Sequence, residues 1–136
     1  SVRLHEMSVT MMEASKVPER ATVPVPPYPG AKVSVALEAN TMELNGRKVQ
    51  CLPSMILLSA DPVEKVLAFY KQELKGFKYK TEFFGMSHLF WNGRDDLDSV
   101  DIENSCATTH VGIRSQKPDV FMPEAKTHIV IIYKPK

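Results

Sequence analysis

The sequence predicts an α+β domain: a mainly antiparallel sheet of about five or six strands, with one main helix (about 62–75) packed on one face. Residues 62–75 show helical periodicity with end signals, and the segments before and after them read as strands. Runs of strands with one segregated helix are typical of this class. A length of 136 residues suits one core. We expect an N-terminal arm and proline-rich strap at 1–31 and a single domain at 32–136.

The helix has start and stop signals. Asp61 is expected to cap the first turn, with Pro62 in the first helical position and Glu64 favouring the positive end of the dipole. Gly76 is expected to end the helix in a left-handed conformation. The apolar stripe comprises Val63, Val66, Leu67, Tyr70 and Leu74, and the polar side comprises Glu64, Lys65, Lys71, Gln72 and Lys75.

Four prolines between residues 24 and 29 force an extended path. This segment could be a ligand for an aromatic-lined groove on another protein. We favour a rigid strap laid across the domain with Tyr28 packed down, because the Pro29-Gly30 pair also signals a turn into the next strand.

Strands are expected on both sides of the helix. Residues 32–44 alternate, with Val33, Val35 and Leu37 on one face, and a tight Asn45-Gly46 turn leads into a strand at 48–59 that Pro53 marks as bulged or at an edge. Further strands are expected at 77–83, 86–91, 108–115 (with Val111 and Ile113 inward) and 127–133. The last is apolar on both sides, which predicts a place at the centre of the sheet.

Composition excludes several classes. The formal net charge of +1 argues against a dedicated nucleic-acid binder. No apolar run approaches the roughly 20 residues that span a bilayer. The chain has no G-x-S-x-G elbow and no glycine-rich phosphate loop, and we expect no cofactor.

Two cysteines, Cys51 and Cys106, lack C-x-x-C spacing. They form either one disulfide, which would imply an oxidising compartment, or two separate buried thiols. The first residue, Ser1, fits removal of a signal peptide and a tag scar equally well.

Metal sites are the next candidates. Oxygen ligands at the density of the acidic cluster suit Ca²⁺, but the spacing departs from an EF-hand loop, and we favour a solvated loop. Its members are Asp95, Asp96, Asp98, Asp101 and Glu103. Of the four histidines, His5, His88, His110 and His128, the last two are expected on strands that could share a face. Separate histidines are the favoured alternative to a transition-metal site.

Four aromatic residues, Phe83, Phe84, Phe90 and Trp91, lie close together in the chain. An exposed patch of them would mark a ligand or partner surface on the sheet. The favoured alternative is a second small core under residues 1–31.

Two segments resemble a known pattern. Pro27-Tyr28-Pro29-Gly30-Ala31-Lys32, followed by the Asp61-Pro62…Val66…Phe69-Tyr70…Leu74 helix, is similar to small uncharacterised bacterial proteins that are often exported or lipid-anchored. In those proteins a YPGA segment precedes a strand and a D-P-x-E-K-V-x-x-F-Y helix follows. The resemblance covers residues 27–76, implies a periplasmic or other envelope location, and implies no known activity.

The sequence therefore favours a non-enzymatic extracytoplasmic domain that binds a protein or a small apolar ligand through the sheet face. One alternative is a small enzyme or metal-binding protein that uses the strand histidines and the acidic loop at 95–103. Another is a structural homodimer subunit, paired edge to edge.

Overall fold

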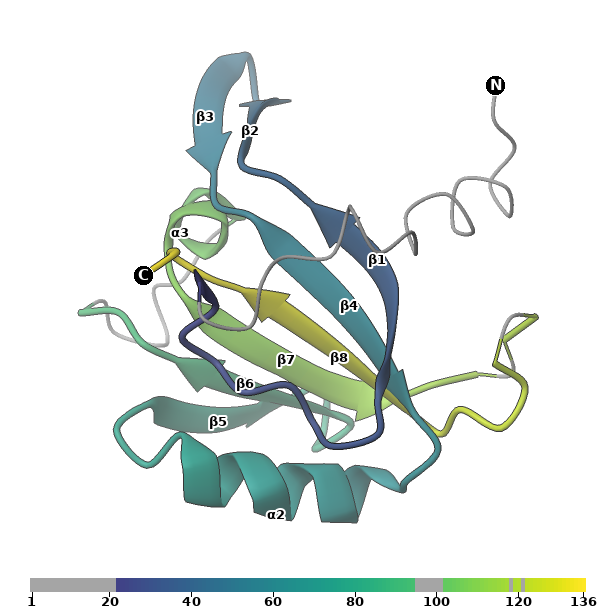
Figure 1. The fold of residues 1–136 in the computed structure, drawn as a ribbon. Coiled ribbons are helices and arrows are strands. Elements are labelled where there is room, and N and C mark those ends of the chain that lie inside the picture. The colour runs from purple at the N-terminus through teal and green to yellow at the C-terminus, as the bar shows by residue number, and fades with distance from the viewer. Residues whose placement is uncertain (1–21, 95–101, 118, 121) are drawn as a thin grey trace.

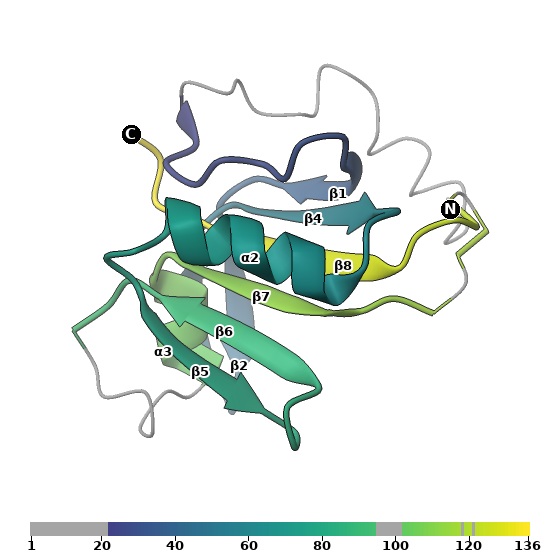
Figure 2. The ribbon, with the colours of Figure 1, turned by 90° about the horizontal axis from the view of Figure 1, so that it is seen from below.

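The computed structural model describes residues 22–94, 102–117, 119–120 and 122–136. A six-stranded antiparallel sheet has the order β1-β4-β8-β7-β6-β5, and helix α2 lies across one face of it (Figures 1 and 2). The predicted α+β class is confirmed. The strands are β1 (Lys32–Leu37), β2 (Asn40–Leu44), β3 (Arg47–Cys51), β4 (Ser54–Ser59), β5 (Lys78–Glu82), β6 (Ser87–Trp91), β7 (His110–Ser115) and β8 (Thr127–Ile132), and the helices are α2 (Val63–Glu73) and α3 (Ile102–Ala107).

Helix α2 packs through its predicted stripe. Val66 and Tyr70 are fully buried and Leu74 is 5% exposed, so the helix seals the first face of the sheet. Glu64 lies in the first turn as predicted, but the predicted cap and the predicted stop are wrong. Pro62 takes the N-cap position with no side-chain cap, and the chain leaves the helix at Leu74 with φ −117°. Gly76 is not left-handed.

The Asp61 carboxylate is used elsewhere, which explains why it does not cap α2. It accepts a hydrogen bond from the Tyr28 hydroxyl, 33 residues earlier in the chain. Its backbone N–H donates to Ser59 Oγ at 3.0 Å. The residue thus ties the proline-rich segment to the loop that enters the helix.

The proline-rich segment is a strap, as predicted. Val23, Val25 and Tyr28 are buried in the same core as α2. The Tyr70 hydroxyl donates to the Pro26 carbonyl at 2.9 Å. The Phe69 ring meets Tyr28 edge-on, with ring centroids 5.3 Å apart. In Figure 1 this dark segment runs alongside α2 in front of the sheet.

The two strands expected before the helix are each divided. Residues 32–44 give β1 and β2, and residues 48–59 fall into β3 and β4 on either side of Pro53, which cannot donate to a ladder. A register shift between Val33 and Val35 places Val33 on the α2 face and Val35 and Leu37 on the opposite face, so the prediction of one shared face is wrong. The Asn45-Gly46 turn is confirmed, with φ of 53° and 79°.

Strand β8 lies between β4 and β7, which confirms its predicted central position. Ile129 and Ile131 are fully buried toward α2, whereas Val130 and Ile132 are half-buried on the other face. Val111 and Ile113 of β7 join the α2 side, also as predicted.

Helix α3 was not expected from the sequence. It begins at Ile102, inside the acidic segment predicted to be a loop, and therefore places Glu103 on a helix. Six residues are too few to show helical periodicity. Asp95, Asp96, Asp98 and Asp101 lie outside the described residues.

The Tyr28–Asp61 contact makes the free energy of unfolding depend on pH in the alkaline range. Burial, followed by the hydrogen bond with Asp61 and its charge, raises the pKa of Tyr28 to about 12. As the pH rises, Tyr28 loses its proton at a lower pH in the unfolded chain than in the folded one. The contribution of the Tyr28–Asp61 hydrogen bond to the free energy of unfolding is therefore complete below about pH 10 and is lost as the pH rises toward 12. We expect Tyr28→Phe to be roughly 1 kcal/mol less stable than wild type at pH 8, and the gap to narrow at pH 11. Urea titrations at both values measure this, and a constant gap would contradict it.

Gly93 is required by close packing. A Cβ there would lie 2.6 Å from Trp91 Nε1 and 2.8 Å from Thr108 Cγ2. We expect Gly93→Ala to lower the free energy of unfolding by about 1–3 kcal/mol, measured by chemical denaturation. Gly112→Ala is the matched control, because its Cβ meets nothing within 4 Å, and it should leave stability unchanged or slightly raised. Equal effects of the two substitutions would refute the packing argument.

Candidate functional site

The second face of the sheet, opposite α2, is the candidate binding surface. At one end α3 packs against β3. At the other end Leu58 is buried with Met122 and Ala125 of the β7–β8 connection. By strand register, the residues on this face include Val35, Ile56, Leu89, Trp91, His110, Gly112, His128, Val130 and Ile132. A hollow lies between the two ends.

This hollow, which we call the sheet concavity, has a volume of about 460 Å³. Four adjacent strands (β5, β6, β7 and β8) and helix α3 contribute to it. Its lining residues are Lys80, Glu82, Ser87, His88, Leu89, Trp91, Ser105, His110, Gly112 and Val130. Figure 2 shows how β5 and β6 curve away from α2, so that the second face is the inside of the curve.

Trp91 and His110 form an aromatic pair that lines the concavity. They are cross-strand partners on β6 and β7, and their ring centroids are 5.2 Å apart. Trp91 is 1% exposed and His110 is 9% exposed. Leu89, Trp91 and Val130 give the concavity an apolar floor, to which His110 adds a polar ring, and Gly112 leaves room above it.

His110 is oriented by its own chain. Its Nδ1 donates to the Thr108 carbonyl at 2.8 Å, which leaves Nε2 as the acceptor of a neutral ring. Burial lowers the pKa of His110, and the hydrogen bond to Thr108 opposes that effect. At neutral pH the side chain therefore offers a fixed, uncharged hydrogen-bonding group.

The polar groups of the concavity lie along its β5 side. Lys80 Nζ and Glu82 Oε2 are 3.6 Å apart on β5, and Ser87 follows on β6. Lys80 supplies a donor with positive charge and Glu82 an acceptor with negative charge. One strand therefore provides both kinds of polar recognition next to an apolar floor.

His88 is one of the residues that line the concavity, but strand register directs its side chain to the α2 side of the sheet. Its register partners are Thr81 and Ile113 on the α2 face, and its Nδ1 is 2.8 Å from the Tyr79 hydroxyl. Burial and the nearby charge of Lys71 lower the pKa of His88. With a neutral ring protonated on Nε2, Nδ1 accepts a hydrogen bond from the Tyr79 hydroxyl, and the two rings stack with centroids 6.0 Å apart.

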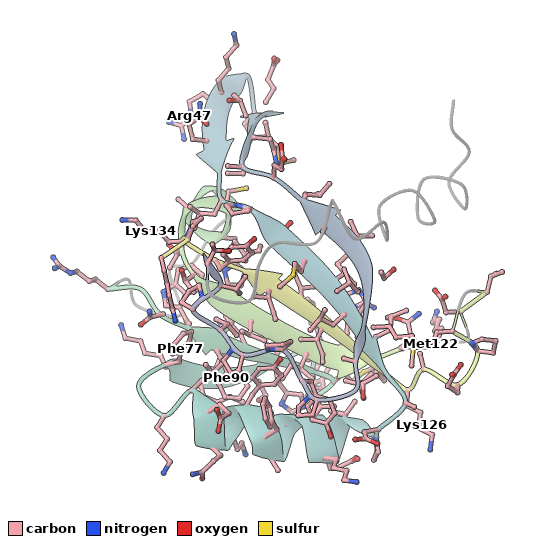
Figure 3. The ribbon with its side chains drawn as sticks, viewed as in Figure 1. Arg47, Phe77, Phe90, Met122, Lys126 and Lys134 are labelled. Carbon is pink, nitrogen blue, oxygen red and sulfur yellow. The ribbon has the colours of Figure 1, made fainter. Side chains whose placement is uncertain are left out.

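The four aromatic candidates occupy three different environments. Phe90 is a core residue beneath α2 (Figure 3), and Trp91 is buried on the second face. Phe83 and Phe84 form the turn between β5 and β6, where they are 73% and 106% exposed. Only Trp91 of the four lines the concavity.

The β5–β6 turn exposes a group of apolar side chains, which we call the aromatic tip: Phe83, Phe84 and Met86. The backbone of both phenylalanines is left-handed, with φ of 53° and 58°. Bulky residues adopt this conformation at a cost of roughly 1 kcal/mol each. The tip therefore combines exposed aromatic surface with the left-handed backbone of a tight hairpin turn, which the Met86 N–H closes by donating to the Phe83 carbonyl at 3.2 Å.

The structure does not bring together the proposed metal ligands that it describes. His110 and His128 share the second face, as expected, but four residues of strand separate their positions along it. His128 pairs with Arg114, and burial, then the charge of Arg114, lowers its pKa. Within the part of the chain that the structure describes, no three His, Cys, Asp or Glu side chains come together as metal ligands. His5 and the four aspartates of the acidic cluster fall outside that part.

Cys51 and Cys106 meet where β3 packs against α3. Both are free thiols in this structure, Cys51 buried and Cys106 half-buried. The two thiols lie near enough for Cys51 to contribute to the raised pKa of Cys106. This contact lies at the α3 end of the second face, and Ser105 of the same helix lines the concavity.

Sequence reasoning missed most of the concavity, including Lys80, Glu82, Leu89, Gly112 and Val130. The alternation of side chains along a strand could have indicated part of the concavity. If Phe90 and Ile131 face the helix, Leu89 and Val130 must face away from it. What the sequence could not supply is strand order, which places these residues on adjacent strands.

The edge strand β5 bears on the alternative of an edge-paired dimer. It carries Lys78, Lys80 and Glu82 within five residues. Charged side chains on an edge strand disfavour pairing with another strand. This edge therefore gives no support to a homodimer.

No family model, no curated protein and no solved structure matches this chain. Among the residues that the structure describes, no helix is long and apolar enough to cross a membrane.

Proposed function

We propose that this domain is a non-enzymatic extracytoplasmic binding module that holds a small ligand in the sheet concavity. The observation that carries the proposal is the concavity itself. Its volume of about 460 Å³ lies within the range of small-molecule sites. Its apolar floor and polar β5 side lie next to each other, as they do in sites that bind an apolar body and orient it by one polar end.

The lining residues define the chemistry of the ligand. Leu89, Trp91 and Val130 favour a flat or branched apolar group. Lys80 favours an anionic or hydrogen-bond-accepting end, and His110 offers a neutral acceptor at Nε2. A ring system or short acyl group that carries a carboxylate or sulfonate would use both parts of the site.

The titratable groups of the concavity are arranged to orient a ligand. The Nδ1 of His110 donates to the Thr108 carbonyl, and burial lowers the pKa of the ring. Lys80 is paired with Glu82. Catalysis would require, in addition, a nucleophile positioned to give its proton to His110.

Two fluorescent probes of the same ring system test the site. N-phenyl-1-naphthylamine is neutral, and 8-anilinonaphthalene-1-sulfonate adds a sulfonate. We expect saturable one-to-one binding of both, and at least tenfold weaker binding in Gly112→Leu, whose side chain would fill the concavity. Lys80→Met should weaken binding of the sulfonate more than binding of the neutral probe, since it removes only the charge contact.

The double variant Phe83→Ser/Phe84→Ser is the matched control, because exposed rings at the aromatic tip could also attract the probes. It should bind both probes as the wild type does. Absence of saturable binding would contradict the proposal. Loss of binding in the tip variant with full retention in Gly112→Leu would also contradict it.

A second candidate function is docking of a partner protein at the aromatic tip. The exposed fractions of Phe83 and Phe84, together with their left-handed backbone, favour it. A protruding pair of rings fits an apolar pocket on a partner, and such anchors dominate the energy of protein interfaces.

Photo-crosslinking tests this second function. With p-benzoylphenylalanine at position 84 in the host cell, we expect one discrete crosslinked protein. The same residue at position 120 is the control, because Val120 is also apolar and 87% exposed but lies elsewhere. The purified partner should then bind the wild type at least tenfold more tightly than Phe84→Ser. Identical crosslinks from both positions, or equal affinities, would remove the tip from consideration.

A further inference from the structure

Cys51 and Cys106 are held together by the backbone around them. Cys51 is the last residue of β3, and Cys106 lies in the last turn of α3. The backbone N–H of Leu52 donates to the Cys106 carbonyl at 2.8 Å. This bond fixes the end of the hairpin strand against the end of the helix, and α3 packs against β3 along the same contact.

The two thiols lie near enough to interact, because Cys51 contributes to the raised pKa of Cys106. Cys51 Sγ is 3.9 Å from the Val49 carbonyl. A disulfide requires Cα atoms roughly 4.4–6.8 Å apart and a sulfur–sulfur bond of about 2.05 Å. The hydrogen bond from the Leu52 N–H to the Cys106 carbonyl places the backbones of the two cysteines next to each other, which is the arrangement that the first requirement needs.

We infer that Cys51 and Cys106 are oxidised to a disulfide that fastens α3 to β3. This assignment does not depend on the ligand site. These are the only two cysteines of the chain, so neither has a competing partner within it.

The oxidant is a low-molecular-weight disulfide such as glutathione disulfide. The Cys106 thiol is the more exposed of the two, and after loss of its proton it attacks one sulfur of the oxidant, which expels one thiolate and leaves a mixed disulfide. The Cys51 thiolate then attacks the Cys106 sulfur and expels the second thiolate. The protein loses two protons and two electrons, and the oxidant becomes two thiols.

The local environment determines the rate of this reaction. Burial, the hydrogen bond with Cys51 and the charge of Cys51 raise the pKa of Cys106 to about 11. Only a small fraction is thiolate at neutral pH, so uncatalysed oxidation should be slow and should accelerate as the pH rises. A bridge buried against α3 should then be equally slow to reduce. Such bridges are typical of oxidising compartments, which agrees with an extracytoplasmic location.

The test uses the wild-type chain. Reduced protein is incubated with glutathione disulfide at low protein concentration, denatured, alkylated and weighed. We expect a monomer that is lighter by two hydrogens and takes up no alkylating agent. Its melting temperature should exceed that of the same sample after dithiothreitol by roughly 10 °C, because the bridge closes a long loop.

Cys51→Ser and Cys106→Ser are the matched controls, and neither melting temperature should respond to dithiothreitol. Two alkylated thiols in oxidant-treated wild type, a stable glutathione adduct, or a disulfide between two molecules would overturn the inference. The mass measurement needs no variant, so a variant that fails to fold leaves the test intact.

Discussion

Tyr70 holds the three layers of this domain together. Its ring is fully buried between the helix and the sheet, and it packs against Phe69 and Phe90 with centroids 4.9 Å and 6.5 Å away. Its hydroxyl donates to the Pro26 carbonyl. A buried hydroxyl that lacked this acceptor would be costly, so the position of the helix and the path of the strap are determined together. Detachment of the strap would expose apolar surface and would leave the Tyr70 hydroxyl without its acceptor.

That arrangement makes the two faces of the sheet unequal. The first face is sealed by α2 and by Val23 and Val25 of the strap. The second face is covered at its two ends, by α3 and by the Leu58 cluster, and is hollow in between. Since β8 is apolar on both sides, it contributes Ile129 and Ile131 to the core and Val130 to the concavity. Alternate residues of this central strand thus stabilise the core, and the residues between them face the candidate site.

Elements that depend on neighbouring residues could be predicted from the sequence, whereas the way these elements pack together could not. The α2 stripe, the Asn45-Gly46 turn and the buried pattern of β8 depend on near neighbours, and all three were predicted correctly. The Asp61 cap failed because its carboxylate bonds Tyr28, a partner 33 residues away that no local pattern indicates. The shared face of Val33 and Val35 failed because a bulge reverses alternation. The concavity needed the order of four strands, which the sequence does not state. The contact of the two cysteines needed the packing of a helix too short to detect.

The position of β8 also affects how the chain can fold during synthesis. Its pairing with β4 joins segments about seventy residues apart, whereas β5–β6 and β2–β3 are local hairpins. The local hairpins can form as soon as they emerge from the ribosome, but β4 and β7 keep their inner edges unpaired until residues 127–132 follow. Those edges are apolar and able to pair with other chains in the interval. A nascent domain with this topology must therefore be protected from aggregation until β8 has been made.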